Sequence, residues 1–458
     1  MDTDTIAAIA TAMTNSGIGI IRISGSNSLS VIDQIYRSKN GKKYLSEVKS
    51  HTLHYGMICD GAEVIDEVLV AVMKAPNSYT KEDTVEIQCH GGIVVMKRIL
   101  ETVIQHGARI AEPGEFTKRA FLNGRMDLSQ AESVMDLISA KNEFARQNSL
   151  RQLQGDLSQK IQTIRQQILH QIAFIESALD DPEHVSLHGY RATLGECVQG
   201  WIADVDNLLK NSENGVLLKE GIHTVIVGKP NAGKSSLLNV LVGKERAIVT
   251  EIAGTTRDVL EEQISLDGII LHVVDTAGIR STEDTVEQIG VKKAKEYLQQ
   301  ADLILYVMDA SVPLDESDEE ILSMIRDRKA IVLLNKSDLD QQIEEQQLAQ
   351  KLNHPILSVS MRNQTGVKEL SSLIQQMFFQ GRLSIHDEVF LTNIRQIENL
   401  REASLSLCMV NESIGLDMPE DFYSIDLMNA YEALGKILGE SVEEDLIDEI
   451  FSKFCVGK

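Results

Sequence analysis

The sequence lacks the features of a secreted, membrane-bound or zinc-binding protein. Its five cysteines are scattered and form no CxxC pair, which argues against a disulfide framework and against a zinc site. No run approaches the roughly 18 consecutive apolar residues that span a bilayer. The opening, MDTDTIAAIA, contains no lysine or arginine and so lacks the basic start of a secretory signal. We therefore expect a cytoplasmic protein that makes no membrane contact.

Positive charge is also scarce. The 44 lysines and arginines face 68 aspartates and glutamates, which gives a formal net charge of -24. A strongly acidic chain repels phosphate backbones, so charge alone disfavours broad, non-specific binding of RNA or DNA. If RNA is a substrate, a local patch or a partner protein must supply much of the binding energy.

What is present indicates a multidomain globular protein of 458 residues. Residues 1–120 mix short β-branched runs with glycine and proline, which predicts an α+β domain. Residues 121–218 and 381–458 have a helical, nearly proline-free texture, which predicts a discontinuous all-α domain. Between them, residues 219–380 alternate strands with helices, which is typical of an α/β domain with a mostly parallel sheet. The sequence therefore predicts an α/β domain inserted into a helical one.

One helical stretch has a measurable period. Nine leucines and isoleucines recur about every 3.6 residues from Leu150 to Leu179, which predicts one straight amphipathic helix. Pro182 disfavours helical geometry in the residue before it, so we expect the helix to end at Asp181.

A phosphate-binding motif opens the α/β domain. Residues 228–235, GKPNAGKS, match GxxxxGKS between a predicted strand and a predicted helix. Backbone N–H groups of such a loop surround phosphates, Lys234 reaches the β- and γ-phosphates, and Ser235 binds Mg²⁺. The residues of this loop predicted to bind nucleotide are Asn231, Ala232, Gly233, Lys234, Ser235 and Ser236. On its own the motif also fits a glycine-rich turn with an exposed lysine.

Three further motifs follow later predicted strands and identify the base as guanine. The first is DTAG at Asp275, Thr276, Ala277 and Gly278, whose carboxylate would lie near magnesium. The second is Asn335, Lys336 and Asp338, where a carboxylate accepts two N–H groups that guanine has and adenine lacks. The third is Ser360, Met361 and Arg362, which resembles the last base-contacting loop of GTPases except at Met361. The four motifs in this order predict a GTP-binding, GTP-hydrolysing domain.

The predicted first switch lies between the phosphate loop and DTAG. Thr256 is a candidate Mg²⁺ ligand there, and Ile279 occupies the place where Ras-like switches carry a water-positioning glutamine. An aliphatic side chain cannot orient water, so another group must do so. The residues of this segment predicted to contact GTP are Thr250, Glu251, Ile252, Ala253, Gly254, Thr255 and Thr256.

Segments outside the α/β domain carry a family resemblance. Residues 112–125 (EPGEFTKRAFLNGR), residues 17–25 (GIGIIRISG) and the C-terminal FCVGK resemble motifs of the bacterial MnmE (TrmE) family of tRNA wobble-uridine modification GTPases. The sequence GTTRD of the first switch, residues 254–258, resembles the corresponding segment of the MnmE (TrmE) family and of Era GTPases. The resemblance covers essentially the whole chain in the right order.

The resemblance implies an N-terminal folate-binding and dimerisation domain, a helical domain and an inserted Ras-like G domain. It implies a homodimer whose G domains pair when potassium is bound, so that K⁺ stabilises the transferring phosphate. The implied potassium ligands are Asn231, Thr250, Ile252 and Thr255. Glu287 matches the family's water-orienting glutamate, and the alternative is an exposed acidic residue at a helix start.

The resemblance also implies a site for a tetrahydrofolate derivative, the 5-formyl or 5,10-methylene form. A pterin needs a carboxylate for its N–H groups, and its glutamate tail needs cations. The implied contacts are Arg22, Glu86, Arg125 and Lys458, with Cys455 as the chemical residue beside them. The simpler alternatives are solvent-facing strand residues, a surface ion pair and an inert tail cysteine.

The implied function is the GTPase subunit of the system that adds an aminomethyl or carboxymethylaminomethyl group to C5 of wobble uridine U34 in tRNA. Its partner would be MnmG (GidA), which carries FAD, in a heterotetramer. Two other functions remain open: an Era-like ribosome-assembly switch, and a free-standing folate-dependent aminomethyltransferase that carries a G domain.

Overall fold

The computed structural model describes residues 4–39, 41, 43–181, 183–184, 187–210, 212–244, 261–275, 298–343, 345–349, 352–379 and 390–458. The chain divides into two compact units. The first comprises residues 1–135, 152–198 and 402–458, and the second comprises residues 136–151 and 199–401.

A seven-stranded sheet of order β3-β4-β5-β6-β2-β1-β7 forms the N-terminal part of the first unit. Its strands are β1 (Ile6–Ile9), β2 (Ser16–Ser24), β3 (Tyr36–Ser38), β4 (Thr52–Asp60), β5 (Glu63–Met73), β6 (Thr84–Gly91) and β7 (Arg109–Ile110). All neighbouring strands are antiparallel except β1 and β7. The β-branched runs of this region therefore become strands, as predicted.

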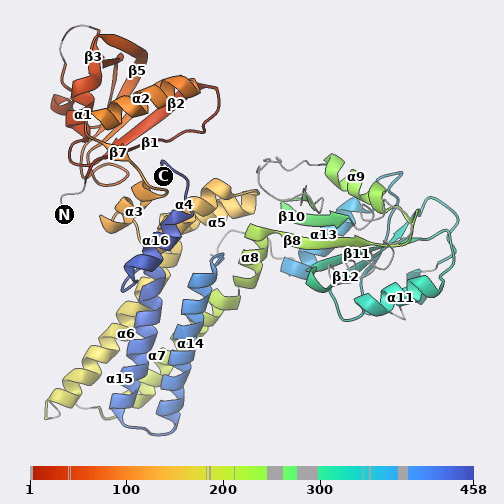
Figure 1. Ribbon diagram of the computed structural model, residues 1–458. Helices are drawn as coiled ribbons and strands as arrows, with labels where there is room; N and C mark the ends of the chain where they lie inside the picture. Colours follow the sequence, from red (N-terminus) through yellow and green to blue (C-terminus); the bar gives the residue numbers. More distant parts are fainter. Residues whose placement is uncertain are drawn as a thin grey trace. The chain divides into compact units, whose positions relative to one another are not determined.

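Two helices cover one face of this sheet (Figure 1). They are α1 (Ser28–Ile35) and α2 (Ile93–Gln105), and a short 3-10 helix, η1 (Leu45–Glu47), follows β3. Alternate strand residues such as Ile21, Val70 and Ile87 are fully buried beneath the helices. The residues between them, which include Arg22 and Glu86, point to the opposite face.

The rest of the first unit is helical. Its elements are α3 (Glu115–Leu122), the first part of α4 (Leu128–Ser139), the end of α5 (Glu143–Gln154), α6 (Asp156–Asp180), the first part of α7 (Tyr190–Lys210), the second part of α14 (Ile394–Gly415), α15 (Glu420–Leu438) and α16 (Glu444–Ser452). Helices α6 and α15 pack side by side (Figure 1). Arg165 of α6 joins them, because its Nε donates to the carbonyl oxygen of Tyr431 on α15 at 3.2 Å, and its Nη1 and Nη2 donate to the carboxylate of Glu440, just beyond α15, at 2.6 Å.

The helix predicted from Leu150 to Leu179 is interrupted, which corrects the sequence-based expectation. Helix α5 ends at Gln154, and Gly155 has a φ of 97° before α6 begins at Asp156. Glycine adopts this left-handed conformation without steric cost, so it separates two helices that the aliphatic period runs across. The period holds within α6, whose Leu157, Ile161, Ile164, Ile168, Ile172 and Ile175 are buried. The expected end is confirmed, since α6 stops at Asp180.

The second unit contains a six-stranded sheet of order β13-β12-β11-β8-β10-β9. Its strands are β8 (Ile222–Val227), β9 (Glu261–Leu266), β10 (Ile269–Asp275), β11 (Leu303–Asp309), β12 (Ala330–Asn335) and β13 (Ile356–Ser358). Every pair is parallel except the β9–β10 hairpin at the edge. The helices of this unit's α/β part are α9 (Lys234–Lys244), α11 (Glu316–Ile325), α12 (Glu345–Ala349) and α13 (Val367–Phe379).

Helices cover both faces of this sheet (Figure 1). Leu237 of α9 and Ile374 of α13 are buried in one cluster with alternate strand residues such as Leu305. Ile325 of α11 and Leu348 of α12 are buried in a second cluster with the intervening residues such as Ile304. The central strands β11 and β12 are therefore buried on both faces, which explains why they appear in the sequence as nearly continuous apolar runs.

The segment 136–151 packs with the α/β sheet's connections. Asp136 accepts from Lys219 at 2.7 Å, at the end of α8 (Ser212–Glu220), and from the Thr392 hydroxyl at 2.9 Å. The Asn148 side chain pairs with both the N–H and the C=O of Phe390. Lys219 and Phe390 lie near the two ends of the inserted region, so this segment holds both of its connections.

The predicted fold class is confirmed: an α+β N-terminal domain, a helical domain and an inserted α/β domain. The boundaries at residues 120, 218 and 380 stay a prediction. Among the residues that the structure describes, no helix is both long and apolar enough to cross a membrane.

Candidate functional sites

The phosphate loop joins β8 to α9, as its motif predicts. Gly228 has a φ of 152°, and a Cβ there would lie 2.2 Å from the carbonyl oxygen of Val307. Gly233 has a φ of 105°, and its Cβ would lie 2.0 Å from Asn335 Nδ2. Asn231 adopts a φ of 62°, a left-handed conformation in which asparagine is enriched. Both motif glycines therefore have a positive φ, and a side chain would collide with the Val307 backbone at Gly228 and with the Asn335 side chain at Gly233.

Lys234 and the two serines after it occupy the first turn of α9. The Lys234 Nζ donates to the carbonyl oxygens of Gly228 at 2.8 Å and of Lys229 at 2.7 Å. The ammonium therefore lies against the loop whose N–H groups are predicted to receive phosphate. Ser235 and Ser236 are exposed at the helix N-terminus, where the helix dipole favours anions and a hydroxyl oxygen suits Mg²⁺.

The sheet topology gathers the other motifs beside this loop. Strands β8, β10, β11, β12 and β13 are parallel neighbours, so their carboxyl ends lie along one edge of the sheet. Asp275 ends β10, Asn335 ends β12, and Ser360 follows β13 by two residues. Open α/β sheets bind ligands at this edge. The order of motifs along the sequence thus becomes one continuous site.

Asn335 connects two of these motifs. Its buried side chain donates from Nδ2 to the carbonyl oxygen of Ala232 at 2.8 Å and accepts from the Met361 N–H through Oδ1 at 3.2 Å. The Met361 side chain is buried in the hydrophobic core, so only its backbone faces the site. This explains how a methionine is accommodated at the position where the sequence departs from the usual pattern.

Asp338 is exposed and oriented by its neighbours. The Ser360 hydroxyl donates to Asp338 Oδ1 at 2.7 Å. This hydrogen bond, with support from the charges of Arg362 and Lys336, holds the pKa of Asp338 below its usual value. The carboxylate therefore stays ionised at neutral pH and can act only as an acceptor, which is what the N–H groups of guanine require.

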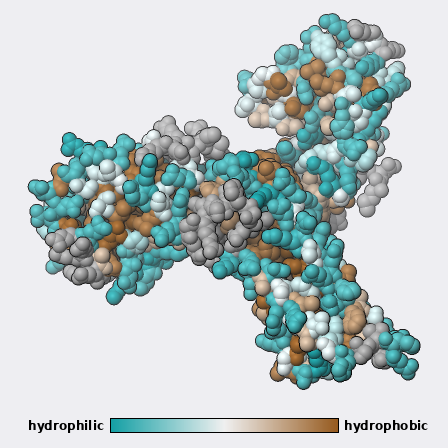
Figure 2. All heavy atoms as spheres, turned by 180° about the vertical axis from the view of Figure 1, so that it is seen from behind, coloured by the Kyte–Doolittle hydropathy of each residue, from teal (hydrophilic) through white to brown (hydrophobic). Residues whose placement is uncertain are grey.

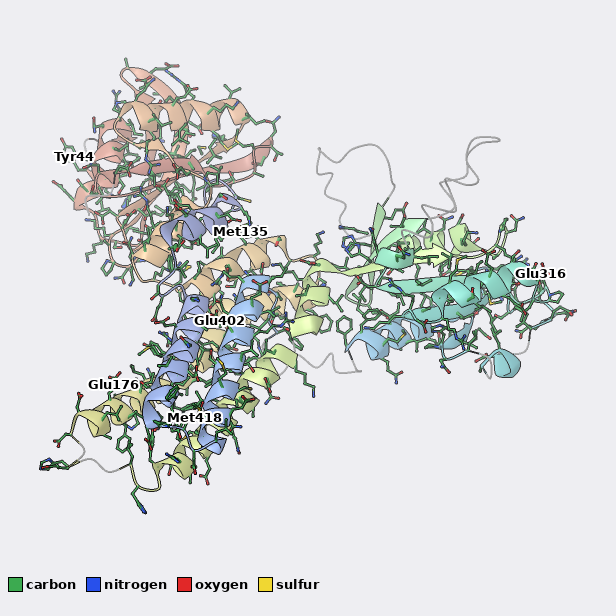
Figure 3. The ribbon with its side chains drawn as sticks, turned by 60° about the horizontal axis from the view of Figure 1, so that its bottom comes forward. Tyr44, Met135, Glu176, Glu316, Glu402 and Met418 are labelled. Carbon is green, nitrogen blue, oxygen red and sulfur yellow. The ribbon has the colours of Figure 1, made fainter. Side chains whose placement is uncertain are left out.

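Two lysines of the motifs are structural anchors, a role that the motif patterns do not reveal. Lys229 pairs with Asp315 at 2.7 Å and with Asp318, at the start of α11, whose first residue Glu316 is labelled in Figure 3. Burial opposes the charge, but these carboxylates outweigh it and raise the pKa of Lys229. Similarly, Lys336 pairs with Asp309 at the end of β11. These three ion pairs tie loops of the site to a neighbouring strand and helix.

The residues predicted to bind folate meet on the open face of the N-terminal sheet. Arg22 on β2 lies opposite Glu86 on β6 in the strand register, and Arg22 Nε donates to Glu86 Oε1 at 2.8 Å. Their side chains are 14% and 20% exposed, so the pair is half-buried and not a solvent-facing strand pair. Arg22 Nη1 also donates to the carbonyl oxygen of Gly457 at 3.2 Å. The C-terminal tail therefore completes this site.

Backbone contacts hold the tail in place. The N–H of Gly114 donates to the carbonyl oxygen of Cys455 at 3.3 Å, and a Cβ on Gly114 would lie 2.5 Å from the carbonyl oxygen of Phe451. Gly457 has a φ of 92°, and its Cβ would lie 2.6 Å from the carbonyl oxygen of Ile9. The Cys455 side chain remains exposed. The tail is thus fixed by its backbone while its thiol is accessible.

Lys458 carries a perturbed charge at this site. Burial and the nearby charge of Arg22 lower its pKa, and Glu86 only partly opposes them. Arg125 is exposed, and its Cζ lies 4.6 Å from the centre of the Tyr79 ring, over which Arg22 also lies at 5.5 Å. The structure therefore brings Arg22, Glu86, Arg125 and Lys458 to one region, with cationic charge in excess.

Comparisons with known proteins identify the family of the chain. A family model described as the MnmE helical domain matches residues 128–455, and one described as GTP-binding protein TrmE N-terminus matches residues 5–125. The tRNA modification GTPase MnmE of Lachnoclostridium phytofermentans is 58% identical over 100% of both chains. The chain belongs to the MnmE family. The proteins of that name from Clostridioides difficile and Geobacillus kaustophilus are 49% and 46% identical over 99% of each chain.

One solved structure that matches is the G domain of the FeoB iron transporter of T. maritima. The match covers 35% of this MnmE-family chain and 98% of the FeoB chain. The identity is 24% and the TM-score 0.27, which is too low to support a conclusion about function.

Several residues predicted for this member of the MnmE family lie outside the described residues. They are Thr250, Glu251, Ile252, Ala253, Gly254, Thr255, Thr256, Thr276, Ala277, Gly278 and Glu287. The backbone of Asp275 is placed at the end of β10. The first switch, three of the four potassium ligands and the water-orienting glutamate therefore stay predictions.

Proposed function

We propose that the chain is the potassium-dependent GTPase subunit of the system that modifies C5 of wobble uridine U34 in tRNA. As a member of the MnmE family, it is a GTP hydrolase that takes part in tRNA modification. The single observation that best supports the nucleotide site is that three guanine-nucleotide motifs, and the strand that leads into the fourth, end at one edge of a parallel sheet. In this proposal, hydrolysis opens and closes the G domains and the bond chemistry occurs elsewhere.

The potassium proposal depends on Asn231. Its φ of 62° places it at the bend of the phosphate loop, and its side chain is exposed there. Its amide oxygen is a suitable K⁺ ligand, with Thr250, Ile252 and Thr255 as the further proposed ligands. A cation at this place would supply positive charge to the transferring phosphate, as an arginine finger does in other GTPases. Ser235 and Thr256 would hold Mg²⁺.

The test is GTP hydrolysis by the purified chain in KCl against NaCl at equal ionic strength. We expect potassium to accelerate hydrolysis by about 10-fold or more, since charge stabilisation of a transition state is a large contribution. Asn231→Gly removes the proposed ligand without strain at a positive φ, and it should abolish the potassium preference. The control is Asn363→Ala, which alters an exposed asparagine of another loop and should leave the potassium preference unchanged. Equal rates in both salts would remove Asn231 from this role.

We further propose that the open face of the N-terminal sheet binds a 5-formyl- or 5,10-methylene-tetrahydrofolate. Glu86 would accept from the pterin N–H groups, while Arg22, Arg125 and Lys458 supply cationic charge for the glutamate tail. The half-buried Arg22–Glu86 pair and the lowered pKa of Lys458 support this assignment. Cys455, exposed at the same place, would be the residue that takes part in one-carbon transfer.

The same sheet face supports the proposal of a homodimer. Beside the Arg22–Glu86 pair it exposes Ile18, Leu53, Tyr55 and Leu69, and Figure 2 shows hydrophobic side chains among the hydrophilic surface of this domain. We also propose that the FAD-carrying partner MnmG (GidA) joins the dimer in a heterotetramer and contributes much of the tRNA binding in the cytoplasm. Such a partner would supply positive charge that a chain of net charge -24 lacks overall.

A further inference from the structure

Tyr79 lies between the two arginines of the proposed folate site, on the loop that joins β5 to β6. Its ring packs against the buried cluster that contains Ile6 and Phe116. Its hydroxyl lies 2.9 Å from Oγ1 of the fully buried Thr117 on α3. Both ends of the side chain are therefore fixed.

The loop around Tyr79 is braced to α3 and to the sheet. Asn123 Nδ2 donates to the carbonyl oxygen of Thr80 at 2.7 Å, and Lys81 Nζ donates to the carbonyl oxygen of Gly124 at 2.8 Å. The Thr80 hydroxyl lies 2.6 Å from the Ser24 hydroxyl on β2. These contacts hold the ring in a defined place between the sheet and the end of α3.

The ring attracts both guanidinium groups, because each Cζ lies within 6 Å of its centre. The two arginines differ in what else holds them. Arg22 is fixed by the Glu86 carboxylate and the Gly457 carbonyl oxygen. Arg125 is exposed and lies nearer to the ring, at 4.6 Å. The aromatic contact should therefore matter more for the orientation of Arg125 than for that of Arg22.

We propose that Tyr79 is a positioning residue for Arg125. It holds the guanidinium ready for the glutamate-tail carboxylates of a reduced folate, while Glu86 serves the pterin. A guanidinium binds a carboxylate through two parallel hydrogen bonds, so its orientation decides the strength of the contact. A contact that orients the arginine beforehand reduces the entropy lost on binding. This inference rests on the proposed folate function.

A double-mutant cycle tests the inference. The dissociation constant for 5-formyl-tetrahydrofolate is measured by calorimetry on the full chain, on Tyr79→Leu, on Arg125→Ala and on the double variant. Tyr79→Leu should weaken binding by about 2- to 5-fold in the otherwise unchanged chain, the size of an exposed cation–π contact. It should weaken binding no further once Arg125 is alanine. Tyr79→Phe keeps the ring and should bind nearly as the parent chain does.

Two controls separate positioning from a structural role. Tyr44→Leu removes an exposed tyrosine of the same domain (Figure 3) and should leave binding unchanged. A tetrahydropterin without the benzoylglutamate tail should bind the parent chain and Tyr79→Leu equally. If leucine prevents folding, as thermal unfolding would report, Tyr79→Met replaces it in the same cycle, because the longer and more flexible methionine side chain adapts to the space left by the ring.

The outcomes distinguish the inference from the function on which it rests. Equal weakening by Tyr79→Leu in both backgrounds, or an equal effect on the tail-less pterin, would overturn the positioning role and leave the folate site standing. No binding of 5-formyl-tetrahydrofolate by the parent chain would overturn the folate site and the inference together.

Discussion

The two candidate sites are assembled in opposite ways. The nucleotide site draws on loops that each follow a parallel strand, so short contiguous motifs meet once the sheet forms. The folate site instead joins side chains from β2 and β6 to a tail that lies 435 residues away from Arg22 in the sequence. A site made of contiguous motifs can be recognised in a sequence, whereas one made of distant single residues needs a known family or a structure.

The two sites also differ in how neighbouring groups balance the charge of a lysine. Burial opposes the charge of Lys229, but Asp315 and Asp318 outweigh it and raise its pKa. Burial and Arg22 lower the pKa of Lys458. The nucleotide domain therefore compensates this cation internally, while the folate site leaves cationic charge uncompensated. Uncompensated positive charge on a half-buried surface favours an anionic ligand.

Cys455→Ser should have the largest effect, because it should separate tRNA modification from GTP hydrolysis. We expect it to abolish wobble-uridine modification and to leave GTP hydrolysis unchanged, because the thiol lies in the first unit and the nucleotide motifs in the second. Modified uridine is measured in tRNA from cells that carry only the variant. Cys408→Ser, which also alters an exposed cysteine, is the control. A normal modification level in the Cys455 variant would refute its chemical role.

The next largest effect should come from Asp338→Asn. An amide presents N–H groups to those of guanine, so we expect GTP affinity to fall by roughly 10³-fold or more and xanthosine triphosphate to become the better ligand. Nucleotide titrations measure both affinities. Asp340→Asn changes an exposed acid two residues away and should have no effect. Unchanged GTP affinity would show that the Asp338 carboxylate does not contact the base.

Asn335→Ala should have an intermediate effect on the nucleotide site. It leaves the Ala232 carbonyl and the Met361 N–H without their buried partner, and each unsatisfied group costs about 1–3 kcal/mol. We expect GTP affinity to fall by about 10- to 100-fold with little change in folate binding. Asn363→Ala is again the exposed control. Equal loss of both ligands would indicate a general loss of folding.

The smallest effect concerns the pH dependence of folate binding. Because the pKa of Lys458 is lowered, its ammonium loses its proton at a lower pH than an ordinary lysine does, and anion binding should weaken as pH rises through that lowered value. We expect a loss of about 3- to 10-fold, the size of one ordinary hydrogen bond, since the contact is partly exposed to solvent. Lys458→Arg stays charged and should retain its affinity at alkaline pH. The same decline in that variant would assign the pH dependence to another group.

Much of the G domain could be predicted from the sequence. Strands β11 and β12 each appear as a nearly continuous apolar run, because burial on both faces removes any need for polar alternation. The phosphate loop could be predicted because its glycines adopt positive φ angles, and a positive φ favours glycine whatever the distant neighbours are. The break at Gly155 also has a local signal, the glycine itself, but the aliphatic period runs across it.

Other features have no local signal. Lys229 belongs to the phosphate-binding motif, yet it pairs with carboxylates about 90 residues later at the start of α11. The segment 136–151 has the texture of the helical domain, yet it packs in the unit that holds the α/β sheet. Tyr79 resembles any loop tyrosine until two guanidinium groups are placed over its ring.

The sequence by itself determined the secondary structure of the α/β domain and the positions of its nucleotide motifs, because both depend on residues within a few positions of one another. Only the tertiary structure decided that Arg22 pairs with Glu86 and reaches Gly457, and that Asn335 bridges Ala232 to Met361. These contacts depend on the strand order of each sheet and on where the tail docks. Neither hydrophobic periodicity nor a sequence motif reveals the strand order or the docking position of the tail. Side-chain patterns indicate which residues are buried and where the chain turns, but not which distant residues they contact.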